Sequence, residues 1–162
     1  MKTALIWGAG GGIGRAITSQ LAKENWKILA AGRHLESFTD FTKNIYDVEL
    51  SDAFSVQSAI TAISQEMSEV DLWVYAAGDI ASLRVNEMRP HDWQRIMQAN
   101  LTGAFLATHF SWPLLSEQAH LFYLGAVSER MRLPGLSAYA AAKAGLQMKM
   151  SFLRRMSIEW PY

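Results

Sequence analysis

The sequence predicts an α/β protein with a doubly wound parallel sheet of about five strands, covered by helices on both faces to give three layers. The first observation behind this prediction is an alternation of short apolar runs with segments of helical periodicity. The second is that the apolar runs are nearly continuous, which is typical of parallel strands buried on both faces. Because crossovers between parallel strands are right-handed, such a series places helices on both sides of the sheet.

The expected elements follow in order along the chain. The expected strands are residues 3–10, 26–32, 44–50, 71–78 and 120–127. Apolar residues at spacings of three and four mark the expected helices, which run from Ile13 to Leu21, Val56 to Met67, Trp93 to Phe105 and Tyr139 to about Ile158. Asp52 is the expected N-cap of the second helix. No repeat or linker separates these elements, so we expect a single domain over residues 1–162.

The composition excludes several classes of protein. Half of the 162 residues are hydrophobic, and 15 basic side chains balance 15 acidic ones, so nothing indicates a nucleic-acid partner. The chain has no cysteine, which excludes disulfides and thiolate metal sites, and we expect no metal. The first apolar run is too short for a signal peptide, and polar residues within the uncharged segment 99–116 favour a buried helix over a membrane span. We therefore expect a cytoplasmic protein without a membrane partner.

A glycine cluster, GAGGGIG, spans Gly8 to Gly14 directly after the first strand. Glycine is needed where the backbone turns tightly and approaches a pyrophosphate. The helix that follows offers unpaired N–H groups and the positive end of its dipole to such an anion. A strand–glycine–helix order is the context that supports a nucleotide site over a simple tight turn.

From this loop onward the chain resembles the short-chain dehydrogenase/reductase family, whose fingerprint is T-G-x3-G-x-G. The resemblance extends over the whole chain through YAAG at residues 75–78, DWQRIMQANLTGAF at 92–105, LPGLSAYAAAKAGL at 133–146 and ELSDAFSV at 49–56. It implies a Rossmann-like fold. It also implies hydride transfer between NAD(P)(H) and a small carbonyl or alcohol substrate.

The same resemblance implies the site residues. Tyr139 would exchange a proton with the substrate oxygen, Lys143 would support it with positive charge and reach the cofactor ribose, and Asn100 would hold a water that links Lys143 to solvent. The implied cofactor-binding residues are Gly8, Gly12, Ile13, Gly14, Arg33, Glu49, Leu50, Ala76, Ala77, Gly78 and Lys143.

The end of the second strand indicates which cofactor is preferred. An Asp or Glu there hydrogen-bonds a ribose 2′-hydroxyl, whereas an Arg accommodates a 2′-phosphate. Gly32 stands in the acidic position and Arg33 follows it. We therefore expect NADP(H) to be favoured, with NAD(H) as the alternative.

Three features depart from the family pattern. Ala126 stands where the family has a serine that orients the substrate carbonyl, and Ser128 is the nearest hydroxyl. Trp7 and Tyr75 replace polar residues at the ends of neighbouring strands, and we expect these aromatics to repack, with an altered cofactor geometry as the alternative. The chain ends at Tyr162, where the family continues with two strands and a substrate lid.

These departures leave two hypotheses open. The first is a reductase or dehydrogenase whose activity is weakened. The second is a catalytically impaired module that binds dinucleotide or only dimerises. For either, the apolar residues on the helices around Asn100 and Tyr139 predict a homo-oligomer.

Overall fold

The sheet is parallel throughout, as the sequence predicts. The computed structural model describes residues 1–33, 41–67, 69–126 and 133–156, and in this part of the chain the strands lie in the order β3-β2-β1-β4-β5. The strands are β1 Thr3–Trp7, β2 Lys27–Gly32, β3 Ile45–Asp47, β4 Val70–Tyr75 and β5 Leu115–Tyr123. The strand order reverses between β1 and β4, which makes their carboxyl ends the topological switch point of the sheet.

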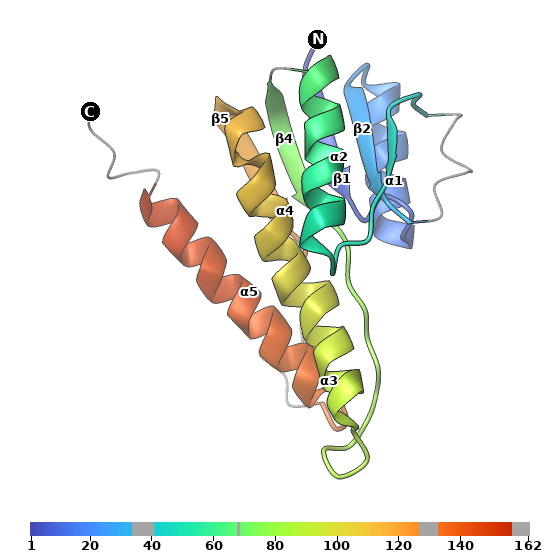
Figure 1. Cartoon of the computed structure of the whole chain (residues 1–162), viewed down its shortest axis with the longest axis vertical. Helices are drawn as coiled ribbons and strands as arrows, with labels where there is room; N and C mark the ends of the chain where they lie inside the picture. Colours follow the sequence, from blue (N-terminus) through green and yellow to red (C-terminus); the bar gives the residue numbers. More distant parts are fainter. Residues whose placement is uncertain (34–40, 68, 127–132, 157–162) are drawn as a thin grey trace.

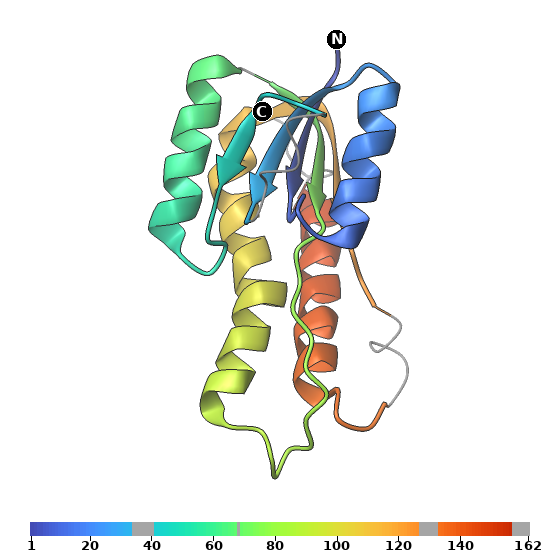
Figure 2. The ribbon, with the colours of Figure 1, turned by 90° about the vertical axis from the view of Figure 1, so that its right-hand side faces the viewer.

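Helices cover both faces of this sheet and confirm the predicted fold class (Figures 1 and 2). They are α1 Gly12–Lys23, α2 Ala53–Glu66, α3 Pro90–Met97, the π-helical turn η2 Gln98–Thr102, α4 Gly103–Ser111, the 3₁₀ turn η3 Trp112–Leu114 and α5 Ser137–Met156. None of the helices in the described ranges is long and apolar enough to cross a membrane.

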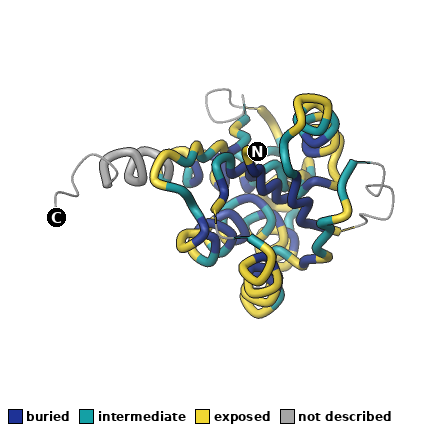
Figure 3. The backbone as a smooth tube through the Cα atoms, turned by 90° about the horizontal axis from the view of Figure 1, so that it is seen from above, coloured by how far each residue is buried: buried dark blue, intermediate teal, exposed yellow. Residues whose placement is uncertain are grey.

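Each face of the sheet has its own hydrophobic cluster. Residues of α1 pack on the face that presents Ala4 and Ile6, whereas α2, α4 and α5 pack on the face that presents Leu5 and Trp7. Successive strand residues point to opposite faces, so an uninterrupted apolar strand can supply both clusters. Figure 3 shows the result as a buried central sheet with exposed outer helix faces.

Asp52 caps α2, as predicted. Its carboxylate accepts hydrogen bonds from the backbone N–H groups of Phe54 at 3.2 Å and Ser55 at 3.1 Å. These bonds satisfy donors that the first helical turn leaves unpaired.

The long helix predicted around Trp93–Phe105 is found as α3, η2 and α4 in direct succession. The π turn was not predicted. At its end the N–H of Gly103 bonds to the carbonyl of Gln98, five residues back, in place of the usual four. Such turns are frequent at functional sites.

The first, third and fourth strands each end three residues before their expected ends, and the predicted fifth strand was wrong at both ends. Residues 120–127 were expected, whereas β5 begins at Leu115 and ends at Tyr123. It ends level with β4, since Tyr123 pairs with Tyr75, the last residue of that strand. The carbonyl of the next residue, Leu124, accepts a hydrogen bond from Nζ of Lys143 at 2.7 Å. The last helix begins at Ser137, close to its expected start, and its expected end at Ile158 lies outside the described residues.

Candidate functional site

A cleft of about 510 Å³ opens at the carboxyl ends of the strands, across the switch point between β1 and β4. Open α/β sheets bind their ligands at this position. The lining residues are Gly8, Gly10, Gly11, Gly32, Arg33, Val48, Glu49, Leu50, Ser51, Ala76, Ala77, Gly78, Asp79, Arg95, Gln98 and Ala99.

The glycine turn forms one wall of the cleft. Gly8 has a φ of +79°, and a Cβ placed on it would lie 2.4 Å from the backbone nitrogen of Ala77. A Cβ on Gly14 would lie 2.2 Å from the carbonyl oxygen of Gly8, so this glycine lets α1 pack against the turn. A Cβ on Gly12 would meet nothing within 4 Å. The glycines thus differ, because two are required by close backbone packing and Gly12 faces open space.

The start of α1 is suited to an anion. Gly11 is its N-cap, and no side chain caps the N–H groups of the first turn. Unpaired N–H groups at a helix start attract a phosphate through hydrogen bonds and through the helix dipole. Ile13, in this first turn, is 60% exposed.

The structure gathers most of the expected cofactor-binding residues at the cleft. The expected residues that line it are Gly8, Arg33, Glu49, Leu50, Ala76, Ala77 and Gly78. Gly12, Ile13 and Gly14 lie beside the cleft in the first turn of α1 and do not line it.

Arg33 and Glu49 form an ion pair at the cleft, with Nη1 and Oε2 3.5 Å apart. Hydrogen bonds from the backbone N–H and the hydroxyl of Ser51 hold the pKa of Glu49 below its usual value, and the Arg33 cation contributes to the same shift. Arg33 therefore faces a carboxylate that a ligand phosphate would have to displace.

Asn100, Lys143 and Tyr139 lie together beyond Gly78. Asn100 has 0% exposure and Lys143 has 3%. A Cβ on Gly78 would lie 2.8 Å from Oδ1 of Asn100 and 3.8 Å from Nζ of Lys143. Nζ of Lys143 is also 5.7 Å from the ring centroid of Tyr139, one helical turn earlier on α5. We call these three residues the catalytic corner, after the roles that the family resemblance implies for them.

The amide of Asn100 has one unsatisfied atom. Its Nδ2 donates to the carbonyls of Asp79 at 2.6 Å and Ile96 at 2.9 Å, whereas its buried Oδ1 has no hydrogen-bond partner among the described residues. A buried acceptor without a partner is costly and is the kind of group that a ligand or an ordered water satisfies.

Tyr75 anchors the π turn that carries Asn100. Its hydroxyl donates to the carbonyl of Ala99 at 2.8 Å, and the ring is fully buried. Burial raises the pKa of Tyr75, which keeps the phenol protonated as a donor. Trp7, paired in register with Tyr75, is also fully buried and lies in the same hydrophobic cluster, so both aromatics pack in the core.

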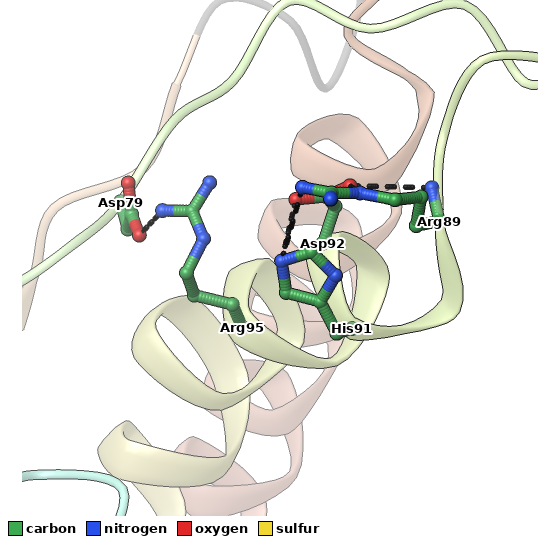
Figure 4. Close-up of polar contacts among 5 residues, drawn as sticks. All are labelled: Asp79, Arg89, His91, Asp92 and Arg95. Atoms are coloured by element: carbon green, nitrogen blue, oxygen red, sulfur yellow. Dashed lines mark hydrogen bonds and ion pairs between the residues drawn. The ribbon is translucent and has the colours of Figure 1, made fainter.

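Two charged residues at the cleft were not predicted. Asp79 follows Gly78, and Arg95 precedes Asn100 by five residues on α3; the two form an ion pair (Figure 4). The available signal for Asp79 was a charged residue directly after the expected strand 71–78. Ala126 is half-buried three residues past β5, and Ser128 lies outside the described residues.

The arrangement is suited to proton exchange beside a bound dinucleotide. A phenol next to a buried ammonium can act as acid or base, because the positive charge stabilises the phenolate. No cluster of three metal-ligating side chains occurs in the part of the chain that the structure describes.

Comparison with known proteins identifies the family. A family model described as "short chain dehydrogenase" matches residues 2–160. The 3-oxoacyl-[acyl-carrier-protein] reductase FabG of Escherichia coli (strain K12) is 30% identical over 154 residues, covering 90% of this chain and 63% of the relative. Serine 3-dehydrogenase of Agrobacterium fabrum is 26% identical over 164 residues, covering 96% and 63%. The aligned part of this chain thus spans 63% of the length of these relatives. With the strand order, the glycine turn and the catalytic corner in place, the chain belongs to the short-chain dehydrogenase family.

Proposed function

We propose that this chain takes part in hydride transfer between a nicotinamide dinucleotide and a carbonyl or alcohol substrate. The observation that carries the proposal is the catalytic corner, in which Asn100, Lys143 and Tyr139 lie next to the glycine-walled cleft. The two relatives described above are named as a reductase and a dehydrogenase, which favours this activity over a catalytically impaired module.

The residues present fit a dinucleotide. The uncapped start of α1 and the open side of Gly12 suit a pyrophosphate, while Glu49 and Leu50 line the part of the cleft suited to an adenosine. The nicotinamide of a bound cofactor supplies or accepts the hydride.

In the direction of reduction, Tyr139 donates its hydroxyl proton to the carbonyl oxygen. Lys143 stabilises the phenolate left behind, and its ammonium is fixed by the carbonyl of Leu124. Asn100 presents its unpaired Oδ1 beside that ammonium, where it can hold a water that returns a proton from solvent. Ala126 has no hydroxyl to orient the carbonyl, and loss of one such donor typically lowers kcat by about 10²–10³.

The activity is tested by following deuteride from 4-deuterated NADPH into a panel of ketones and aldehydes. Tyr139→Phe should abolish transfer, because it removes the proton donor. Ala126→Ser should raise the rate, because it supplies an orienting hydroxyl. Full transfer by Tyr139→Phe would contradict the assignment of the proton donor, and no transfer by the wild type or by Ala126→Ser would contradict the proposed activity.

We expect NADP(H) to bind better than NAD(H), because Arg33 offers a guanidinium at the end of β2. Thermal shifts with each nucleotide at equal concentration should favour NADPH. Arg33→Asp should reverse the preference, whereas Glu49→Gln should increase it by freeing Arg33 from its ion pair. If Arg33→Asp still preferred NADPH over NADH to the same extent, a role of Arg33 in cofactor preference would be contradicted.

We propose no narrower substrate class than a small carbonyl or alcohol, because the relatives are named for different substrates.

A cytoplasmic location and a homo-oligomer stay predictions. Exposed apolar residues support the second: Trp93 on α3, Phe105 on α4 and Met148 on α5. Light scattering should give at least a dimer, and a well-folded monomer at micromolar concentration would contradict this expectation.

A further inference from the structure

The orientation of Asn100 depends on a carbonyl outside its own helix. One Nδ2 hydrogen is directed to Ile96, four residues earlier on the helix, and the other to Asp79 in the segment after β4. With both hydrogens engaged, Oδ1 must lie on the opposite side, near Gly78 and Lys143. If the carbonyl of Asp79 moved away, the amide would keep one of its two anchors.

The segment that contains Asp79 has no regular structure of its own. From Ala76 to Arg84 the chain forms neither helix nor strand. The carboxylate of Asp79 forms an ion pair with Arg95 on α3, and its backbone carbonyl accepts a hydrogen bond from Asn100. This one residue therefore contacts both Arg95 and Asn100. Figure 4 shows Arg95 reaching from the helix to Asp79 on this segment.

The other charged groups near the start of α3 do not compete for this contact. Arg89 bonds to one carboxylate oxygen of Asp92, and His91 lies 3.1 Å from the other. Arg89 and Asp92 cap α3, and Arg95 forms its ion pair with Asp79 (Figure 4). Arg89 therefore offers a matched control, because it is an arginine on the same helix with a carboxylate partner of its own.

We propose that Arg95 is a positioning residue: its ion pair with Asp79 fixes the carbonyl that orients the amide of Asn100. The proposal rests on the proposed function, because Asn100 matters through the catalytic corner. Since Asp79 and Arg95 also line the cleft, the pair connects the wall that a bound dinucleotide would touch with the residues that exchange the proton.

This role differs from a contribution to stability. The side chains of Arg95 and Asp79 are 45% and 33% exposed, and ion pairs in contact with water contribute little to folding. Arg95→Met should therefore leave the denaturant midpoint nearly unchanged while it loosens the amide of Asn100. A direct role in binding would instead weaken the affinity for the nucleotide.

The test uses the side-chain amide of Asn100 observed by NMR in the ligand-free chain, with its signals assigned by their loss in Asn100→Asp. In Arg95→Met the exchange of these protons with water should accelerate about fivefold or more, the factor expected for loss of one net hydrogen bond. Arg95→Lys should restore part of the protection, and Arg89→Met should leave it unchanged. Wild-type exchange in Arg95→Met would overturn the proposal.

A second measurement separates this proposal from the proposed function. In deuteride transfer, Arg95→Met should lower kcat by about fivefold or more with a KM for NADPH within about threefold of the wild type, since the loss is of orientation and not of binding. A raised KM with unchanged kcat would overturn the positioning role. If no protein transfers deuteride but amide exchange responds as expected, the positioning contact stands and the proposed function fails.

Discussion

The two walls of the cleft are built in different ways. The wall formed by the β1 turn and α1 consists of backbone and glycine, and the contact that packs α1 on the turn joins Gly8 and Gly14, six positions apart. The wall formed by η2 and the segment after β4, with α5 packed against η2, consists of side chains, and its contacts join residues far apart, as between Asn100 and Asp79 or Lys143 and Leu124.

This difference shows what each wall requires. The glycine wall needs the absence of side-chain atoms at Gly8 and Gly14, so a Cβ added at either position would disrupt its packing. The side-chain wall requires several elements to be positioned correctly relative to one another. A substitution there should change the orientation of its side chains while the fold persists. Three predictions test this comparison, in order of decreasing expected effect.

Gly14→Ala should have the largest effect. Its Cβ would lie 2.2 Å from the carbonyl oxygen of Gly8 and 2.9 Å from Cα of Ala9, and backbone cannot move aside as a side chain can. We expect the free energy of unfolding to fall by about 3 kcal/mol or more, measured by urea titration. Gly12→Ala is the control, because its Cβ meets nothing within 4 Å. It should change stability by less than about 1 kcal/mol but weaken dinucleotide binding about tenfold. Equal destabilisation by both variants would contradict the distinction between packing and ligand-facing glycines.

Tyr75→Phe should have an intermediate effect. The ring would keep its stacking on Trp73, at 6.1 Å between centroids, but the carbonyl of Ala99 would lose its hydroxyl donor. We expect a loss of about 1–2 kcal/mol in urea unfolding, with faster amide exchange at Asn100 on the same π turn. Tyr123→Phe removes a buried hydroxyl that contacts Thr108 and should leave the exchange at Asn100 unchanged. If both variants accelerate that exchange equally, the π turn is not held by Tyr75 in particular.

The smallest expected effect concerns the docking of α5 through Lys149. Its ammonium donates to the hydroxyl of Thr108 at 2.8 Å and lies 4.9 Å from the ring centroid of Tyr123, and burial lowers the pKa of Lys149 from 10.5 to about 8. Below pH 8 the ammonium is charged in both states, and its burial costs free energy. Between pH 8 and 10.5 the unfolded chain binds more protons, so stability rises with pH across this window.

Lys149→Met should remove this rise. The free energy of unfolding of the wild type minus that of the variant, measured by urea titration, should increase by about 1 kcal/mol between about pH 7 and 9.5. A difference that stays flat or falls with pH would mean that the hydrogen bonds of Lys149 outweigh the cost of burying its charge.

Local residue patterns were sufficient for much of this molecule. The continuous apolar runs predicted the parallel sheet, and Asp52 predicted the cap of α2. The glycine turn could be located for the same reason, since its conformation and its contact with α1 depend on neighbours within a few residues.

The side-chain wall was predicted only through resemblance, and in part. Asn100, Lys143 and Tyr139 were named, but the contacts that hold Asn100 were not, because Asp79, Tyr75 and Arg95 come from separate elements. The π turn was missed because a helix with one extra residue in its turn keeps almost the same apolar periodicity. The end of β5 was missed because the apolar run continues through Leu124 and Ala126, beyond the last paired residue Tyr123.

The sequence by itself determined the presence and order of the strands, the parallel winding and the glycine turn, because each depends on short-range periodicity or on local backbone freedom. Only the tertiary structure decided that Arg33 faces Glu49, that Asp79 joins Arg95 to Asn100, and that the buried Oδ1 of Asn100 lies near Lys143. These contacts arise where helices and strand ends meet at the carboxyl edge of the sheet, and their partners lie too far apart along the chain for any local pattern to record them.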